Sequence, residues 1–243
     1  MFFKSKLEKA VENQTHIGFV VERKPKSVVS EAYRTLRTNI QYSSFDKKMQ
    51  TILITSAEAA EGKSTVAGNL ALTFAQNDSK VIIIDCDLRK PSVHKNFKIS
   101  NRIGLSELLL GKAELQEAVQ QRNDNLFVLT SGKIPPNPSE MLASSVMTNL
   151  IGKLRKEYDV IILDSAPVGA VTDPQILSTK VDGTILVTRA ERTKRDIVLE
   201  AKNSLEKVGA NLIGCVLHGV ENTKGKYYYY YGSDGEEKKK KVK

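Results

Sequence analysis

Short runs of apolar residues recur along the chain, and longer segments with helical spacing of apolar residues separate them. The apolar runs predict buried strands at 51–55, 81–85, 126–129, 160–163, 184–188 and 212–217. Helices are expected between them, at 64–76, within 139–158 and at 193–208, where Gly209 is the stop signal. Wholly apolar strands that alternate with amphipathic helices predict an α/β fold, with a mostly parallel sheet covered by helices on both faces.

The two ends of the chain have a different pattern. Residues 1–26 are polar, lack clear periodicity and are expected to form an N-terminal arm. Ser30 is expected to cap a helix that runs to about Tyr42. Residues 27–222 would then form the main domain, and residues 223–243, rich in Lys, Gly and Tyr, are expected to be a flexible tail because they can bury no core.

Composition narrows the class of protein. The 243 residues are 40% hydrophobic and 27% charged, which is ordinary for a soluble globular chain. The two cysteines, Cys86 and Cys215, are too few for a disulfide framework, so a reducing cytoplasm is expected and Cys86 is interpreted as a core residue. No apolar run is long enough for a membrane-spanning helix. The net charge is +9, but no nucleic-acid-binding motif is present, so a nucleic-acid partner is not expected.

A phosphate-binding loop is predicted between the first strand and the helix that follows it. Residues 56–65 read Ser-Ala-Glu-Ala-Ala-Glu-Gly-Lys-Ser-Thr and stand in the strand–loop–helix context that such loops require. Backbone N–H groups at the start of the helix would hold phosphate, Lys63 would reach the β- and γ-phosphates, and the Ser64 hydroxyl would ligate Mg²⁺. The alternative is a plain turn with a capping serine.

This loop departs from the usual pattern at two places. Ala57 stands where the first glycine is usual, and Ala59-Ala60 stand where related loops often have Pro-Gly. If position 60 needs a positive φ, alanine there carries about 1 kcal/mol of strain. An inactive nucleotide-binding module is therefore a further alternative.

Three aspartates follow predicted strands. Asp85 and Asp87 end the second strand, where the alternation of side chains places both on one side and Cys86 on the other. Asp164 ends the fourth strand. Because ligands bind at the carboxyl ends of parallel strands, these acids are expected beside the Lys-Ser loop as a metal site. Each aspartate alone could instead be a helix cap or turn former.

These residues together resemble a known family, the bacterial protein-tyrosine kinases that regulate capsule and exopolysaccharide synthesis. The resemblance covers about residues 18–235 and comprises a Walker A loop at 56–65, a Walker A′ strand at 82–91 and a Walker B strand at 160–167. It also includes Pro-Pro-Asn-Pro at 135–138 and a terminal run of tyrosines. The helix pattern Glu-x2-Arg-x2-Arg is matched by Glu31, Arg34 and Arg37.

The resemblance implies a P-loop enzyme that uses ATP and Mg²⁺ to phosphorylate tyrosines. Lys63 would be catalytic and Asp85 would accept or orient the phenolic proton. Ser64, Asp87 and Asp164 would hold Mg²⁺. The predicted nucleotide-binding residues are Glu61, Gly62, Lys63, Ser64, Thr65 and His218, the last standing where relatives often place an asparagine near adenine.

The resemblance also implies partners and a location. The phosphoacceptors would be Tyr227, Tyr228, Tyr229, Tyr230 and Tyr231, entering the active site of a neighbouring subunit. Glu31, Arg34 and Arg37 would make contacts in a ring, for which an octamer is one candidate size; the alternative for them is a solvated helix face.

A membrane-bound activator of the polysaccharide co-polymerase type, with a cytoplasmic tail, would hold a cytoplasmic kinase at the inner face of the membrane. Other protein tyrosines would be further substrates. The competing class is a regulatory or scaffold P-loop ATPase of the partitioning or septum-site type without tyrosine transfer. Its loop usually has a lysine where this chain has Glu58, and it lacks a terminal tyrosine run.

Overall fold

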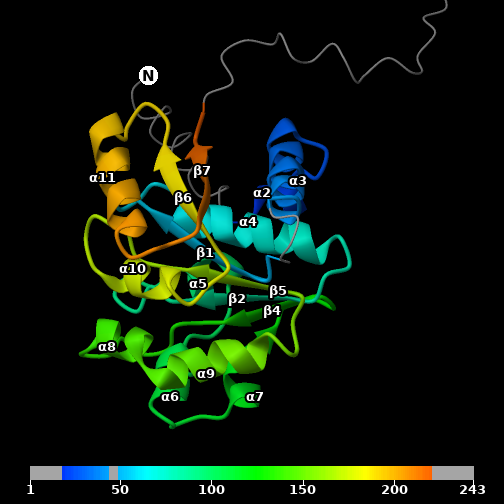
Figure 1. The fold of residues 1–243 in the computed structure, drawn as a ribbon. Coiled ribbons are helices and arrows are strands. Elements are labelled where there is room, and N and C mark those ends of the chain that lie inside the picture. Colours follow the sequence, from blue (N-terminus) through cyan, green and yellow to red (C-terminus); the bar gives the residue numbers. More distant parts are fainter. Residues whose placement is uncertain (1–17, 44–48, 221–243) are drawn as a thin grey trace, which may run out of the picture.

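One seven-stranded sheet organises the protein, in the order β3-β4-β2-β5-β1-β6-β7 (Figure 1). The computed structural model describes residues 18–43 and 49–220. The strands are β1 (Thr51–Ser56), β2 (Val81–Asp85), β3 (Val119–Gln121), β4 (Leu126–Leu129), β5 (Val160–Asp164), β6 (Gly183–Arg189) and β7 (Leu212–His218). The six predicted strands are confirmed to within one residue at each end. The short β3 was not predicted, and it is the strand that pairs antiparallel, with β4.

Helices cover both faces of the sheet, as predicted (Figure 1). One face carries α2 (Val20–Arg23), α3 (Val28–Gln41), α4 (Lys63–Ala75) and α5 (Val93–Phe97). The other carries α6 (Leu105–Leu109), α7 (Leu115–Ala118), α8 (Pro138–Ala143), α9 (Ser145–Leu154), α10 (Asp173–Ser178) and α11 (Arg195–Glu206). The alternation of strand side chains feeds the two cores, since Ile52 and Ile54 pack under α4 whereas Leu53 packs on the opposite side.

The N-terminal arm predicted for residues 1–26 is wrong for its last part. Phe19 and Val21 are buried in the core beneath α4, with the Phe19 and Phe97 ring centroids 4.5 Å apart. Phe19 fits because position 68 is glycine: a Cβ on Gly68 would lie 2.1 Å from the Phe19 ring. The apolar run Phe19-Val20-Val21 is too short for a periodic signal, although Phe19 and Val21 anchor the chain. Residues 1–17 lie outside the described part of the chain.

Two helix predictions also need correction. Ser27, rather than Ser30, caps α3, because its hydroxyl accepts the Ser30 N–H at 3.2 Å. The Ser30 hydroxyl instead donates to the Lys24 carbonyl at 2.7 Å. The region 139–158 holds two helices, because Ser144 leaves the helical conformation at the end of α8 and caps α9 through the Met147 N–H.

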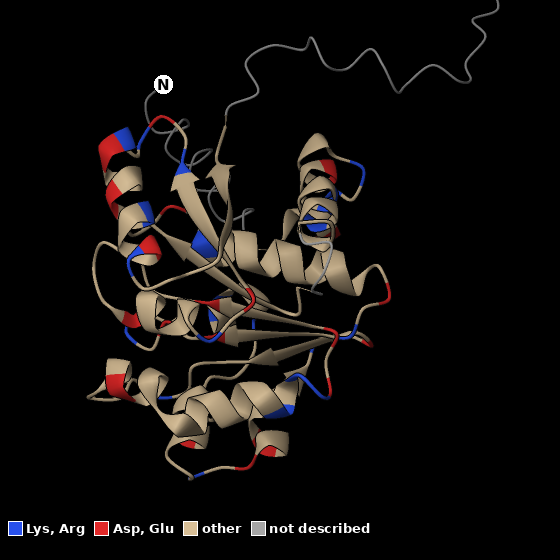
Figure 2. Cartoon of the chain, viewed as in Figure 1, with Lys and Arg blue, Asp and Glu red and all other residues tan. Residues whose placement is uncertain are grey.

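Charged residues lie mainly on the outer helices, in loops and at strand ends, while the strands carry few along their length (Figure 2). In the part of the chain that the structure describes, no helix is long and apolar enough to cross a membrane.

An ion pair closes the edge of the sheet opposite to the carboxyl ends of the strands. Asp182 Oδ2 lies 2.9 Å from Arg155 Nη1 and accepts the N–H and hydroxyl of Thr51, both at 2.9 Å. Burial alone would raise the pKa of Asp182, but the hydrogen bonds from Arg155 and Thr51 outweigh it and lower the pKa to about 2. Asp182 therefore ties β1, α9 and the start of β6 together in its ionised form.

Replacing this carboxylate should cost stability in a pH-dependent way. Asp182→Asn is expected to lower the free energy of unfolding by about 1–3 kcal/mol at pH 7, because the buried carboxylate that pairs with Arg155 and accepts the Thr51 hydrogen bonds is lost. Since the folded pKa lies below the unfolded value, the contribution is present above about pH 4 and is lost as the pH falls toward 2. Urea unfolding at several pH values measures this. The exposed Glu157→Gln is the control, and a loss for Asp182→Asn that does not shrink with falling pH would contradict the account.

Candidate nucleotide and magnesium site

The loop between β1 and α4 is built around two residues with positive φ. Gly62 has φ +92° and Ala60 has φ +63°. The Ser56 hydroxyl donates to the Glu58 carbonyl at 2.7 Å, which closes the start of the loop. This geometry turns the chain sharply into α4, so the N-terminal N–H groups of that 13-residue helix face the carboxyl edge of the sheet.

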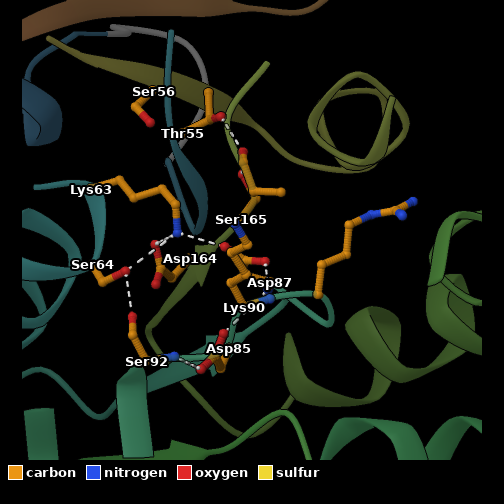
Figure 3. A network of polar contacts seen from close by, with 12 residues as sticks. Thr55, Ser56, Lys63, Ser64, Asp85, Asp87, Lys90, Ser92, Asp164 and Ser165 are labelled. Atoms are coloured by element: carbon orange, nitrogen blue, oxygen red, sulfur yellow. Dashed lines mark hydrogen bonds and ion pairs between the residues drawn. The ribbon is translucent and has the colours of Figure 1, made fainter. Parts of the chain in front are cut away.

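Strand register brings the predicted acids together. Asp164 on β5 lies directly opposite Asp85 on β2 and opposite Ile54 on β1, which leads into the loop. Asp85, Asp87 and Asp164 are all buried. Lysine and acids thus meet at one edge because three neighbouring strands end there (Figure 3).

Lys63 lies among these acids. Its Nζ is 2.9 Å from Asp87 Oδ2 and 3.7 Å from Asp164 Oδ1. Burial opposes the charge of Lys63, but the attraction of Asp164 and Asp87 outweighs it, and the pKa of Lys63 is raised. The amine is therefore a fixed positive charge, as phosphate binding requires.

Asp164 is fully buried, and neither of its oxygens accepts a hydrogen bond of good geometry. Burial raises its pKa, against the lowering effect of Lys63 and Ser64. A buried carboxylate with unused lone pairs beside a serine hydroxyl is what an oxygen-ligated cation would satisfy.

The residues present fit Mg²⁺. Among the described residues no three His, Cys, Asp or Glu side chains gather in an all-protein cage. Mg²⁺ does not need one, because it is usually held by one or two carboxylates together with water and substrate phosphates. Ser64, Asp87 and Asp164 supply a hydroxyl and two carboxylates of this kind.

Asp85 lies in the same cluster but is used differently. Its Oδ1 accepts the Asp87 N–H at 3.2 Å, and its Oδ2 accepts the N–H groups of Ser92 and Val93, both at 3.0 Å. Burial and the neighbouring Asp164 raise its pKa to about 7. The structure places Asp85 beneath the cavity and Asp87 on its wall.

A cavity of about 480 Å³ opens above this cluster, a size suited to a small-molecule ligand. Gly62, Lys63, Ser64 and Thr65, four of the predicted nucleotide-binding residues, line it together with Asp87, a predicted metal ligand. An apolar wall from the segment after β5 completes it: Ala166, Pro167, Ala170 and Val171.

Two other predicted nucleotide-site residues brace the loop. The Glu61 side chain is buried, and its carboxylate accepts the Glu58 N–H at 2.9 Å and the Thr193 hydroxyl. His218, at the end of β7, packs on the loop backbone: a Cβ on Gly62 would lie 2.3 Å from its ring. Burial lowers the pKa of His218. Neither side chain lines the cavity.

Arg89 lines the cavity, and its guanidinium is held by two residues of other elements. The sequence did not reveal these contacts. Its guanidinium binds the fully buried Asp173 through Nε at 2.9 Å and Nη2 at 3.1 Å, and Nη2 also donates to the Ser139 hydroxyl at 2.9 Å. Ser139 directly follows the Pro-Pro-Asn-Pro segment, and its contact with Arg89, together with that of Asp173, links the Walker A′ loop to α8 and α10. No spacing rule links positions this far apart.

Ser92 was also missed, although it stands at the cavity wall with its hydroxyl 2.8 Å from Ser64 Oγ. The available signal was a serine before the apolar Val93, which suggests only a helix start.

The predicted contact residues on α3 are partly engaged within the chain. Arg34 pairs with Glu31 and donates to the Pro25 carbonyl at 2.8 Å, while Arg37 donates to the Thr73 carbonyl of α4 at 3.1 Å. Glu31 and Arg34 remain solvent-accessible. The predicted phosphoacceptor tyrosines, residues 227–231, lie outside the described part of the chain.

Known proteins share this arrangement. A family model described as an AAA domain matches residues 49–196. Tyrosine-protein kinase YwqD of Bacillus subtilis (strain 168) is 46% identical over 201 residues, which cover 82% of this chain and 85% of that protein. The chain belongs to the bacterial tyrosine-protein kinases.

Solved structures agree with this family. The chimerical protein CapA2B2 is 39% identical with a TM-score of 0.79, over 86% of this chain and 97% of that one. The kinase domain of the Escherichia coli tyrosine kinase ETK is 35% identical with a TM-score of 0.82, over 88% and 84%. The P-loop fold and the enzyme class are therefore as predicted, and the alternative of an ATPase without tyrosine transfer is set aside.

The structure answers the question raised by the altered loop of this kinase. Ala60 does adopt the left-handed conformation, in which a Cβ costs about 1–2 kcal/mol. Ala59 does not have a positive φ, although both alanines are exposed and line the cavity.

Ala60→Gly should therefore raise the free energy of unfolding by up to about 1 kcal/mol, since released strain exceeds the added flexibility of the unfolded chain. Ala59→Gly is the matched control and should lower it by about 0.5–1 kcal/mol. Denaturant unfolding of both variants measures the difference. Equal effects at the two positions would mean that Ala60 carries no strain.

Proposed function

We propose that this kinase transfers the γ-phosphoryl group of ATP, with Mg²⁺, to tyrosines of its own C-terminal tail. The observation that carries the proposal is the cluster formed by Lys63, Ser64 and Asp87, which line one cavity, and the buried Asp164 beside Lys63. In P-loop enzymes, catalysis of this transfer is mainly positioning and charge neutralisation, and this cluster supplies both.

The loop and α4 would bind the triphosphate. N–H groups at the start of α4 and the Lys63 amine would face the β- and γ-phosphates. In this structure Lys63 neutralises Asp87 and Asp164. When nucleotide and metal bind, these contacts of Lys63 would have to change. With Mg²⁺ bound, Asp87 and Asp164 would hold the cation, and the Lys63 amine would be free to neutralise phosphate charge.

Mg²⁺ would be held by Ser64, Asp87 and Asp164 and would neutralise charge on the β- and γ-oxygens. The phenolic oxygen would form the new bond to phosphorus while the bond to ADP breaks. A phenol has a pKa near 10, so its proton must go to a base. We propose Asp85 for that role, as the sequence predicts, because its raised pKa of about 7 suits a proton acceptor and its oxygens keep further lone pairs beside the backbone N–H groups that they accept.

The tail is proposed as the substrate in trans. Tyr227, Tyr228, Tyr229, Tyr230 and Tyr231 follow one another in the sequence, so one short segment offers five acceptor hydroxyls. We propose residues 18–222 as the kinase domain, since Phe19 and Val21 belong to its core, and 223–243 as this substrate tail.

Assembly and partner are proposed on the family resemblance. Glu31 and Arg34 on α3 are accessible for a contact between subunits in a ring, and Arg37 would support α3 from the α4 side. A membrane activator with a cytoplasmic tail would hold the kinase at the membrane and link it to capsule or exopolysaccharide synthesis.

Lys63→Met should abolish tail phosphorylation, by at least about 100-fold, because the charge that faces the phosphates is lost. Mass spectrometry of residues 221–243 after incubation with Mg-ATP and activator measures it. Lys207→Met, on an exposed lysine after α11, is the control and should leave phosphorylation unchanged. Phosphotyrosine in the Lys63 variant at the normal level would refute the assignment.

Phosphorylation should also change the assembly. Phosphotyrosines carry about −1.5 to −2 charges each, so phosphorylated tails should repel one another and favour dissociation of the ring. Size-exclusion chromatography with light scattering, before and after Mg-ATP treatment, measures the size. A variant with phenylalanine at 227–231 is the control and should keep its size, and an unchanged wild-type size with phosphorylated tails would contradict the proposal.

A further inference from the structure

Ser92 connects two parts of the site that the proposed function treats separately. It follows the Walker A′ strand, just before α5, and lines the cavity. Its hydroxyl donates to Ser64 Oγ at 2.8 Å, while its own N–H donates to Asp85 Oδ2 at 3.0 Å (Figure 3). The chain of contacts therefore runs from the buried Asp85 through Ser92 to the hydroxyl proposed to ligate Mg²⁺.

Asp85 fixes Ser92 from below. The carboxylate is fully buried and gathers three backbone N–H groups, those of Asp87, Ser92 and Val93, so the segment 85–93 winds around it. Multiple charge-assisted hydrogen bonds of this kind hold a loop rigidly. The backbone of Ser92 thus has a defined place relative to the sheet.

The bond to Ser64 has a consequence for its lone pairs. A hydroxyl oxygen has two lone pairs and one proton. Ser92 occupies one lone pair of Ser64 Oγ, and the contact from Lys63 Nζ, at 3.4 Å, is long for a hydrogen bond. The second lone pair of Ser64 Oγ is therefore available to a cation, on the side where Lys63 and Asp164 lie.

We propose that Ser92 is a positioning residue that orients the Ser64 hydroxyl for Mg²⁺, and that Asp85 acts through it. This inference rests on the proposed function, because it assumes that Ser64 ligates the metal. In this proposal Asp85 also has a positioning role, which differs from proton transfer. The coupling between Mg²⁺ and nucleotide binding then depends on Ser92, a residue outside the Walker A loop.

The test is the binding of ADP to the full-length chain by calorimetry, once with Mg²⁺ and once with EDTA. The ratio of the two dissociation constants reports the coupling between metal and nucleotide. For Ser92→Ala we expect that ratio to fall about 2- to 10-fold, the loss of one hydrogen bond, while binding in EDTA changes less than twofold. Ser92→Thr keeps the hydroxyl and should restore the ratio.

Two further variants make the outcome decisive. Ser64→Ala should bring the ratio close to one, and if it does not, the proposed metal role of Ser64 fails. If it does, but Ser92→Ala keeps the wild-type ratio or weakens binding equally with and without Mg²⁺, only the inference about Ser92 is overturned. Ser92→Cys preserves the size of the side chain with a weaker donor and should behave like Ser92→Ala, so a packing defect in the alanine variant does not decide the result.

Discussion

The attraction between one ammonium group and three buried carboxylates is the interaction on which the site depends. Asp85 and Asp164 lie opposite each other on paired strands, so the sheet holds their carboxyl groups close together, and the resulting repulsion contributes to the raised pKa of Asp85. Lys63 offsets this repulsion together with the N–H groups that surround Asp85. Buried like charges need such compensation because water no longer screens them. The loop, α4 and the Walker A′ segment are arranged to provide it.

Much of the fold could be predicted from the sequence, because buried parallel strands are continuous apolar runs that few other structures produce. The predictions that failed concern short segments and single residues. The strand β3 is too short and polar to give a periodic signal, and it forms only because β4 is beside it. Phe19 and Val21 look like part of a polar arm until Gly68 and Phe97 provide a place for them. Ser27 and Ser30 are equivalent as capping residues in sequence, and only tertiary contacts of Ser30 decide between them.

The sequence was enough to predict which residues form the site, but not where each of their side chains points. Lys63, Ser64, Asp87 and Asp164 meet as their strand ends require, whereas side-chain alternation gave no basis for separating Asp85 from Asp87. That separation arises after the strand, where the chain turns and wraps its N–H groups around Asp85. The buried Glu61 side chain accepts the Thr193 hydroxyl, and Arg89 binds Asp173 at the start of α10. Such contacts join segments far apart in sequence, so no local pattern contains them.

The unused lone pairs of Asp164 bear on the lifetime of this kinase in a cell. A ligand that binds only the folded state stabilises it by mass action. Where opening and closing are fast compared with cleavage, proteases remove proteins in proportion to how often they open. Copies that carry metal and nucleotide would thus survive longer than empty ones, so ligand occupancy would influence the abundance of the enzyme as well as its rate.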